Sequence, residues 1–218
     1  HQKIVIDTIT KKDLGVIVAP PGSGKTIVGL KIIAEKKQPA LIITHRKQIA
    51  YQWMERIETF LGIPKNEIGK IGQGKTKIGK QITVAMIQSL SKELEKPDGV
   101  KLLNAFGTII LDECHHIPAE TFRNTISKLQ TYYLYGLTAT PFRKYNDDRL
   151  IFAYLGDVIS EVTSNEIENF KHAQIIVRNT NLDVPFNSKT DNFETLSKIL
   201  VHDSERNKLI LNDIKNEL

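Results

Sequence analysis

Short apolar runs alternate with amphipathic stretches along most of the chain. The run 40–44, Ala-Leu-Ile-Ile-Thr, has the length and aliphatic composition of a strand buried on both faces. In the stretch 25–37, Ile27, Leu30 and Ile33 recur at helical spacing, which predicts an amphipathic helix. The same two patterns predict strands at 15–19, 40–44, 82–85, 107–111 and 132–136, and helices at 25–37, 46–61, 87–94 and 119–130.

This alternation of strands and helices indicates the fold class. Near-continuous apolar strands separated by helices are typical of a parallel sheet that is covered on both faces. We therefore predict an α/β fold, with an open, mostly parallel sheet and helices on both faces. Such folds bind ligands just beyond the carboxyl ends of their strands. The residues that immediately follow the strands are therefore the candidates for function.

The pattern becomes less regular after about residue 146. It predicts a helix at 148–155, strands at 158–162 and 174–177, a polar loop at 179–191, and two helical stretches that end at Leu218. We expect one domain over residues 1–160, followed over 161–218 by a connector and the incomplete beginning of a second domain. The chain begins with His1 rather than Met, which we interpret as a sign that it is excised from a longer protein.

Composition narrows the class of protein. The 218 residues are 40% hydrophobic and 25% charged, a globular balance that excludes collagen, coiled coil and global disorder. We expect no membrane span, because no apolar run reaches the ~18 residues that cross a bilayer. We also expect no signal peptide, because the N-terminus lacks an apolar stretch and a cleavage site. The single cysteine, Cys114, excludes an internal disulfide framework and favours a reducing, cytoplasmic location. A net charge of +5 is compatible with a polyanionic partner, but many ordinary basic proteins share it.

The segment between the first strand and the first helix reads Ala-Pro-Pro-Gly-Ser-Gly-Lys-Thr over residues 19–26. A loop that opens a helix places several backbone N–H groups, and the positive end of the helix dipole, around one point. Gly22 and Gly24 let the backbone close around phosphate oxygens. Lys25 can reach the β- and γ-phosphates, and the Thr26 hydroxyl can bind Mg²⁺. We therefore predict a nucleotide phosphate site lined by Pro21, Gly22, Ser23, Gly24, Lys25 and Thr26.

A second segment matches the phosphate-loop pattern G-x-x-x-x-G-K-[ST] more strictly than the first. Residues 69–76 fit every position of this pattern, whereas Ala19 stands where the first segment should have its leading glycine. Context favours the first segment, because residues 77–80 lead into a strand and not into a helix. We interpret residues 69–76 as a solvated loop of glycine and lysine.

Two adjacent carboxylates, Asp112 and Glu113, follow the fourth strand. In a chain with a phosphate loop they suggest divided roles, in which Asp112 holds Mg²⁺ and Glu113 orients and deprotonates the attacking water. The next residues, Cys114, His115 and His116, do not predict a zinc site. Adjacent residues of an extended segment point apart, and the sequence has no second ligand cluster at suitable spacing. We place His115 near the γ-phosphate or in contact with a neighbouring segment.

Three segments in order along the chain resemble motifs I, II and III of the superfamily 2 helicases, in the DExH group. They are Gly22–Thr26, Asp112–His115 and Leu137–Pro141. Segments 44–53 and 82–90 look like motif Ia and the stretch that the family carries before motif II. The resemblance covers roughly residues 1–160 and is strongest to the branch that contains the repair translocase of factor IIH and the type III restriction subunits.

The resemblance implies a RecA-like P-loop NTPase domain that uses ATP and Mg²⁺ and acts on nucleic acid, with DNA favoured over RNA by the branch. It also implies that Gln2 reads adenine, and that Thr138 and Thr140 couple the ATP site to the nucleic acid. A threonine-rich turn is the alternative for these two residues. The sequence departs from the family pattern at Ala19, which replaces a glycine, and at His115, which replaces the aspartate of the commoner motif.

Members of this family have two RecA-like domains, with ATP between them and nucleic acid across their tops. The second domain supplies an arginine to the phosphates, and this sequence has no counterpart of that motif. Residues 203–207 resemble the family's lead-in to the second domain. We therefore expect the missing second helicase domain to complete the site, and weak or absent ATP hydrolysis by this chain alone.

Basic residues give the nucleic-acid candidates. Arg46 and Lys47 begin a helix, where a phosphodiester would meet cationic side chains and free N–H groups. Together with Thr44, in the motif Ia segment, they are the expected nucleic-acid contacts, and a solvated helix start is the alternative. The lysines of the segment 65–80 either line a phosphate track or are simply solvated.

Two questions remain open at the level of the sequence. Trp53 shares an apolar helix face with Ile49, Ile57 and Phe60, which favours a core position over a base-stacking one. For the function, an RNA helicase of the same architecture and a non-motor, ATP-dependent binding switch are the alternatives to a DNA motor.

Overall fold

The computed structural model describes residues 11–117, 119–140, 148–162, 177–179, 187 and 192–217. The predicted adenine-reading Gln2, Pro141 of the third motif, and three of the four positions of the strand expected at 174–177 lie outside these residues. The chain divides into two compact units, His1–Phe170 and Lys171–Leu218.

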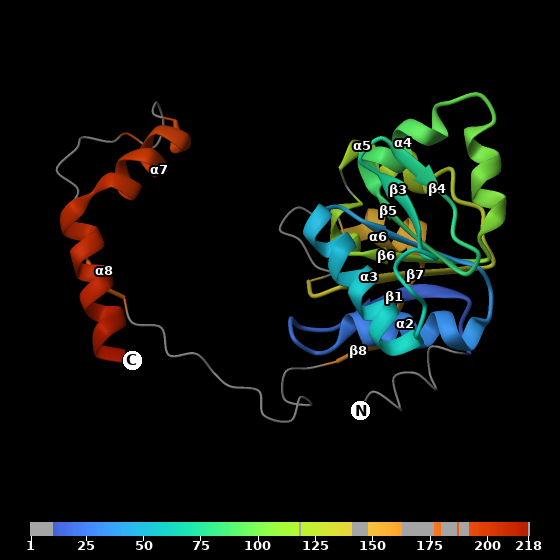
Figure 1. Cartoon of the computed structure of the whole chain (residues 1–218), viewed down its shortest axis with the longest axis horizontal. Helices are drawn as coiled ribbons and strands as arrows, with labels where there is room; N and C mark the ends of the chain where they lie inside the picture. Colours follow the sequence, from blue (N-terminus) through green and yellow to red (C-terminus); the bar gives the residue numbers. More distant parts are fainter. Residues whose placement is uncertain are drawn as a thin grey trace. The chain divides into compact units, whose positions relative to one another are not determined.

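An eight-stranded sheet forms the centre of the first unit (Figure 1). Its strands are β1 (Leu14–Val18), β2 (Ala40–Thr44), β3 (Gly69–Gly72), β4 (Lys75–Lys77), β5 (Ile82–Met86), β6 (Thr108–Asp112), β7 (Tyr133–Thr138) and β8 (Val158–Glu161). The helices are α2 (Lys25–Lys36), α3 (Lys47–Leu61), α4 (Ile87–Leu94), α5 (Glu120–Ile126) and α6 (Asp148–Leu155), with 3-10 turns η1 (Gly99–Ala105) and η2 (Cys114–His116). Each strand and helix predicted before residue 146 is confirmed, although the helix expected at 119–130 ends earlier than predicted.

The strands are arranged in the order β4-β3-β5-β2-β6-β7-β1-β8. Neighbouring strands are parallel except for β3 and β4, which are antiparallel. β2 and β6 are buried at every position, which explains why their sequences are apolar runs rather than alternating ones. The predicted open, mostly parallel α/β sheet is therefore confirmed.

Helices cover both faces of the sheet (Figure 1). On one face, Leu30 of α2 and Trp53 of α3 belong to the same buried cluster as Ile42 of β2. On the other face, Leu90 of α4 belongs to a second cluster with Leu41, the preceding residue of β2. Adjacent strand residues point to opposite faces, so a single apolar run supplies both halves of the core.

One residue of the predicted apolar face of α3 is not in the core. Trp53 and Ile57 are 1% and 0% exposed, as expected, but Phe60 is 52% exposed. It lies in the last turn of the helix, just before Gly62 adopts the left-handed conformation (φ 66°) that ends α3. The Arg56 guanidinium stands 5.9 Å from the centre of its ring. The grouping of Phe60 with the buried face is therefore wrong.

The stricter glycine-lysine match, residues 69–76, is not a solvated loop. It forms an antiparallel hairpin in which Ile71 pairs with Thr76, and β3 also pairs in parallel with β5. The turn residues Gln73 and Gly74 both have positive φ, 55° and 73°, as two-residue hairpin turns require. Gly69 is buried so closely that an added Cβ would lie 2.2 Å from the backbone nitrogen of Gly79. The sequence prediction was right that no helix starts here, and wrong about the loop.

The described part of the second unit consists mainly of two helices, α7 (Phe193–His202) and α8 (Ser204–Glu217). Asn192 caps α7, because its side-chain oxygen accepts a hydrogen bond from the Glu194 backbone N–H at 2.9 Å. These helices confirm the two helical stretches expected near the end of the sequence. Across all the residues described in both units, no helix has the length and apolar character needed to cross a membrane.

The contact of α2 with α3 generates a prediction about stability. Gly29 of α2 is buried, and an added Cβ would lie 2.7 Å from the Trp53 ring and 3.2 Å from Leu137 Cδ1. Ala is favoured over Gly in a helix by about 1 kcal/mol, but overpacking a core costs about 1–3 kcal/mol. We expect Gly29→Ala to lower the free energy of unfolding in urea, and Lys31→Ala on the exposed face of α2 to change it by less than about 0.5 kcal/mol. A stabilised Gly29→Ala protein would contradict the packing argument.

Candidate functional site

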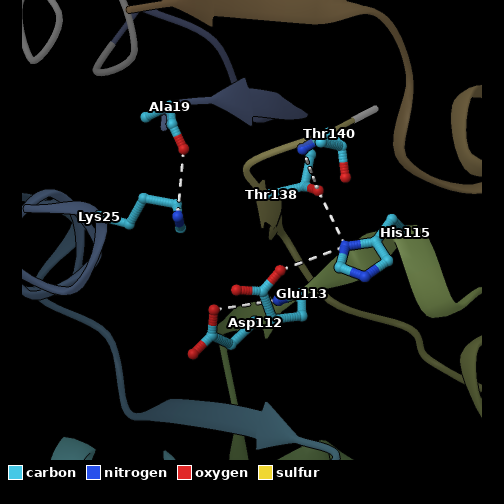
Figure 2. Close-up of polar contacts among 7 residues, drawn as sticks. All are labelled: Ala19, Lys25, Asp112, Glu113, His115, Thr138 and Thr140. Atoms are coloured by element: carbon cyan, nitrogen blue, oxygen red, sulfur yellow. Dashed lines mark hydrogen bonds and ion pairs between the residues drawn. The ribbon is translucent and has the colours of Figure 1, made fainter. Parts of the chain in front are cut away.

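Three neighbouring strands of the sheet, β6, β7 and β1, end at the same edge. Their registers are fixed by parallel pairing, with Asp112 beside Leu137 and Val18 beside Thr138. The segments that follow these strands are therefore brought together, although they are far apart in the sequence. The predicted phosphate loop, the carboxylate pair and the threonines of the third motif all lie here (Figure 2).

The loop after β1 has the geometry expected of an anion site. Gly22 and Gly24 have φ values of 78° and 86°, in the left-handed region that favours glycine. Gly24 is the N-cap of α2, and it provides no side-chain cap for the N–H groups of the first turn. The Ser23 hydroxyl is buried and has no hydrogen-bond partner among the described residues. The loop thus presents donors that an anionic ligand can satisfy.

Lys25 and Thr26 form the start of α2. The Lys25 ammonium donates a hydrogen bond to the Ala19 carbonyl at 3.1 Å, so the side chain folds back across the loop (Figure 2). Thr26 is half-buried beside it, and Pro21 is exposed at the outer side of the loop. The Ala19 N–H donates to the Thr138 carbonyl at 2.9 Å, which ties the loop to the end of β7.

Asp112 is the last residue of β6 and is 7% exposed, so it is not a solvated surface group. The Trp53 indole N–H donates to its Oδ2 at 2.6 Å, and the Glu113 backbone N–H donates to its Oδ1 at 2.9 Å. Burial raises the pKa of Asp112, and the bond from Trp53 opposes this rise because it stabilises the ionised form. The indole therefore fixes the orientation of the carboxylate and favours its charge.

This hydrogen-bonding role of Trp53 is not evident from the local sequence pattern. The apolar helix face predicted the core position of Trp53, which is confirmed, but not its hydrogen bond to a residue 59 positions away. The missed signal is the indole N–H itself, because a buried indole must find an acceptor. Asp112, the last residue of β6, is that acceptor.

Glu113 has a left-handed backbone conformation (φ 53°, ψ 50°), which is uncommon for a residue with a Cβ. The chain turns sharply at this point, out of β6 and into η2. Its carboxylate Oε2 lies 3.2 Å from His115 Nδ1. The bond to His115 lowers the pKa of Glu113, burial opposes this effect, and the nearby Lys25 ammonium adds to it. Glu113 is therefore ionised at neutral pH.

His115 connects the carboxylate to the third motif (Figure 2). Its Nδ1 also lies 3.0 Å from the Thr138 hydroxyl, and that hydroxyl accepts a hydrogen bond from the Thr140 N–H at 3.2 Å. Thr138 is fully buried, whereas Thr140 is exposed. A continuous polar path thus runs from Glu113 to the segment after β7. His115 therefore contacts a neighbouring segment, which is one of the two positions expected for it.

The segment Cys114–His116 is a 3-10 turn, so the expectation of an extended segment is wrong. Cys114 is buried in the core, where burial raises the pKa of its thiol. The ring centres of His115 and His116 lie 4.3 Å apart, and the ring centre of His45 also lies 4.3 Å from that of His116. Among the described residues, no group of His, Cys, Asp and Glu is arranged to hold a metal ion by itself.

The expected nucleic-acid residues lie at the carboxyl end of β2. Thr44 is buried, and its hydroxyl donates to the Ala85 carbonyl at 3.4 Å, so its side chain faces the interior. Arg46 is the N-cap of α3 and Lys47 its first residue, and both are exposed. His45 lies between them and Thr44, with a buried Nδ1 that has no partner among the described residues. Burial, and then the nearby Arg46, lower the pKa of His45.

Known proteins share this sequence pattern. The family model described as type III restriction enzyme, res subunit, matches residues 1–143. The DNA 3'-5' translocase XPB2 of Sulfurisphaera tokodaii is 32% identical over 186 residues, which are 83% of this chain and 40% of that protein. A putative ATP-dependent RNA helicase, L396 of Acanthamoeba polyphaga mimivirus, is 31% identical over 163 residues, 73% of this chain and 30% of that protein. The chain thus spans less than half the length of these relatives.

Solved structures share the fold. The UvsW helicase from bacteriophage T4 has a TM-score of 0.60 and 20% identity, and the match covers 73% of this chain and 58% of that one. At this identity the likeness supports the fold alone. The family model, in contrast, matches well over half of the chain. The chain therefore belongs to the family described as type III restriction enzyme, res subunit.

Proposed function

We propose that this motor domain binds ATP with Mg²⁺ at the edge formed by β1, β6 and β7, and that it couples ATP hydrolysis to movement on DNA. One observation carries the proposal. An uncapped helix start with a lysine, at residues 22–25, follows β1, and the adjacent carboxylates Asp112 and Glu113 lie at the end of β6, with only β7 between these two strands. The Asp112 carboxylate accepts a hydrogen bond from the Glu113 backbone N–H. Use of ATP is what the family implies.

The loop after β1 supplies the phosphate contacts. Backbone N–H groups at the start of α2 and the two left-handed glycines surround the phosphates, and the helix dipole adds partial positive charge. The Lys25 ammonium exchanges the Ala19 carbonyl for phosphate oxygens, which makes a stronger, charge-assisted hydrogen bond. The buried Ser23 hydroxyl gains a partner in the same step.

Thr26 and Asp112 are the residues that would hold Mg²⁺. A hydroxyl and one carboxylate are a sufficient protein share for this ion, which takes its other ligands from water and phosphate. When bound, Mg²⁺ neutralises charge that develops on the phosphate oxygens. Each Asp112 oxygen accepts one hydrogen bond and keeps a lone pair for a ligand.

Glu113 is the proposed general base. A base must be unprotonated before it can take a proton from water, and the bond to His115 lowers the pKa of Glu113 so that this condition is met. His115 and Thr138 would report the state of this carboxylate to Thr140, at the exposed end of the polar path. Gln2 is proposed as the adenine reader from the family resemblance, and it lies outside the described residues.

DNA is the proposed track, with Arg46 and Lys47 at the exposed start of α3 as contacts for its phosphates. The relatives support this only in part, because one is named a DNA translocase and another an RNA helicase. The test uses an active protein that contains this domain and measures its rate of ATP hydrolysis once with added DNA and once with added RNA. The polymer that stimulates hydrolysis more strongly distinguishes a DNA motor from an RNA helicase. ATP binding with no stimulation by either polymer would instead indicate a non-motor switch.

The remaining part of the motor is proposed to lie in a second RecA-like domain. Residues 161–218 are proposed to be the connector to that domain and its incomplete beginning. The relatives are more than twice as long as the segment they share with this chain. A second domain would supply an arginine to the phosphates, and such arginines contribute about 10³–10⁵ to the rate in related enzymes.

The choice between the two glycine-lysine segments is tested by nucleotide affinity. We expect Lys25→Ala to weaken ATP binding by about 10- to 100-fold, because a hydrogen bond to a charged group is worth about 1.5–3 kcal/mol. Lys75→Ala, in the β3–β4 hairpin, should leave ATP affinity unchanged in calorimetry without nucleic acid. If Lys75→Ala were the damaging change, the assignment of the phosphate site would be wrong.

The role of Glu113 is tested by Glu113→Gln in an active protein that contains this domain. The amide keeps the shape of the side chain but cannot accept a proton, so we expect ATP to bind normally and turnover to fall by about 10²–10⁴-fold. Filter binding of labelled ATP and a phosphate-release assay measure the two quantities. Turnover close to that of the unaltered protein would transfer the water-activating role to another residue.

The indole bond to Asp112 predicts a pH effect. Trp53→Phe removes the N–H that stabilises the ionised carboxylate, so the pKa of Asp112, already raised by burial, should rise further. Because Mg²⁺ requires the ionised form, we expect the acid limb of Mg²⁺-dependent ATP binding to move to higher pH. Ile57→Val removes packing from the same buried face of α3 without touching this bond. An equal shift in both variants would mean that the effect comes from packing.

A further inference from the structure

A cavity of about 400 Å³ lies where α2 and α3 end and β5 begins, and its lining residues take no part in the function proposed above. Its volume is within the range of ligand sites, about 300–1,000 Å³. We propose that this cavity binds an acidic segment of a partner protein, which inserts an apolar side chain beside two lysines. We call it the amino-edge pocket and define it by Ile33, Lys37, Leu61, Lys80 and Ile82.

Strand pairing fixes the position of the amino-edge pocket. Ala40 and Ile82, the first residues of β2 and β5, pair with each other in parallel, and the Ala40 N–H donates to the Gln81 carbonyl at 2.8 Å. The segments that precede the two strands are therefore held together at the amino edge of the sheet. The proposed ATP site lies beyond the carboxyl ends of the strands, so a ligand in the amino-edge pocket does not compete with ATP for space.

The floor of the amino-edge pocket is apolar. Ile33 of α2 and Ile82 of β5 are buried members of the core cluster that α2 and α3 share with the sheet. Leu61, the last residue of α3, and Ile63 are half-buried against the same cluster. An apolar side chain that enters the cavity would therefore extend the core, as the central anchor of a protein interface does.

The rim of the amino-edge pocket carries positive charge. Lys37, directly after α2, and Lys80, shortly before β5, are both exposed, and none of the described residues that line the cavity has a carboxylate. Glu35, two residues before Lys37, is paired instead with Lys31 at 2.6 Å. Two ammonium groups beside an apolar floor complement a ligand that has both an apolar and an anionic part.

Helix stability explains only one of these two charges. Lys37 is the C-cap of α2, where a cation offsets the negative end of the helix dipole. Lys80 follows no helix, because the hairpin of β3 and β4 precedes it and β5 comes next. Its ammonium has no ion pair with a carboxylate in the described parts of the chain. A ligand carboxylate is the partner that its position on the rim favours.

Hydrogen bonding favours a peptide over a fatty acid as the ligand. The carbonyl groups in the last turn of α2 point toward this edge, and Pro39 has no N–H to bond the Glu35 carbonyl four residues before it. Gln38 and Gln81 add side-chain amides to the lining, and each amide both donates and accepts. A peptide brings backbone N–H and C=O groups to these partners, whereas an acyl chain brings none. A fatty acid is the competing class of ligand.

The test adds labelled peptides to the 218-residue chain. Each peptide has one apolar residue, either leucine, phenylalanine or tryptophan, between aspartates. Fluorescence anisotropy gives the affinity, and the methyl NMR signals of Ile33 and Ile82 report whether the cavity is occupied.

Two variants alter the rim of the amino-edge pocket. Lys37→Gln with Lys80→Gln removes both charges, and Ala34→Glu adds a carboxylate at an exposed lining position. The matched control is Lys75→Gln with Lys92→Gln, which removes two exposed charges from the β3–β4 hairpin and from α4. Thermal unfolding confirms that each variant folds, and ATP affinity is measured in parallel.

We expect the loss of both rim charges to weaken peptide binding by about 10-fold, since each exposed ion pair is worth up to about 5-fold in affinity. Ala34→Glu should weaken it as well, because its carboxylate repels the aspartates. A peptide with alanine in place of the apolar residue should bind about 10-fold or more weakly than the leucine peptide, because it buries less apolar surface. The control variant should bind the peptides as the unaltered chain does, and ATP affinity should be the same in all variants.

Each other outcome overturns the inference in a recognisable way. If none of the peptides shifts the methyl signals of Ile33 and Ile82, the amino-edge pocket is not a peptide site. If peptides with lysine in place of aspartate bind as tightly, the charge argument is wrong. If dodecanoate binds and the peptides do not, the ligand is a fatty acid and the assignment to a partner protein fails. None of these results concerns the ATP or DNA contacts, so the function proposed above is tested separately.

Discussion

Parallel pairing of β6, β7 and β1 is the constraint on which the candidate site depends. Backbone hydrogen bonds along these ladders hold Asp112 beside Leu137 and Val18 beside Thr138. Because all three strands run in the same direction, the segments after them emerge at one edge, and a shift of register would separate them. The strands are buried by helices on both faces, which makes such a shift costly. The positions of the phosphate loop and of Glu113 therefore follow from the packing of the core.

The α3 helix connects three parts of the molecule. Its buried face contributes Trp53 and Ile57 to the core, and the same Trp53 donates to Asp112 in the site. Its first residue, Lys47, lies at the exposed edge, where it approaches Tyr51 and the hairpin. A rigid helix that holds both an indole on the carboxylate and cations at the surface is a physical link between the proposed ATP and nucleic-acid contacts.

Periodicity in the sequence was sufficient to predict the central strands, the helices and the loop after β1, because these depend on local patterns of apolar residues and on glycine. The β3–β4 hairpin was missed, since its strands are short and rich in lysine and glycine. The bond from Trp53 to Asp112 and the tilted ring contact between His45 and His116 were also missed. Both join segments that are distant in the sequence, and only the strand order brings them together.

The hairpin has a consequence for the sheet as a whole. β4 is the outermost strand on one side, so its free backbone groups are open to pairing with another chain. It is only three residues long, Lys-Thr-Lys, and every position is exposed. Short, lysine-bearing strands are poor templates for intermolecular β-sheet growth, because addition of a second strand would bring ammonium groups together without water. The lysines of β4 thus help to protect a long, mostly parallel sheet from aggregation at this border.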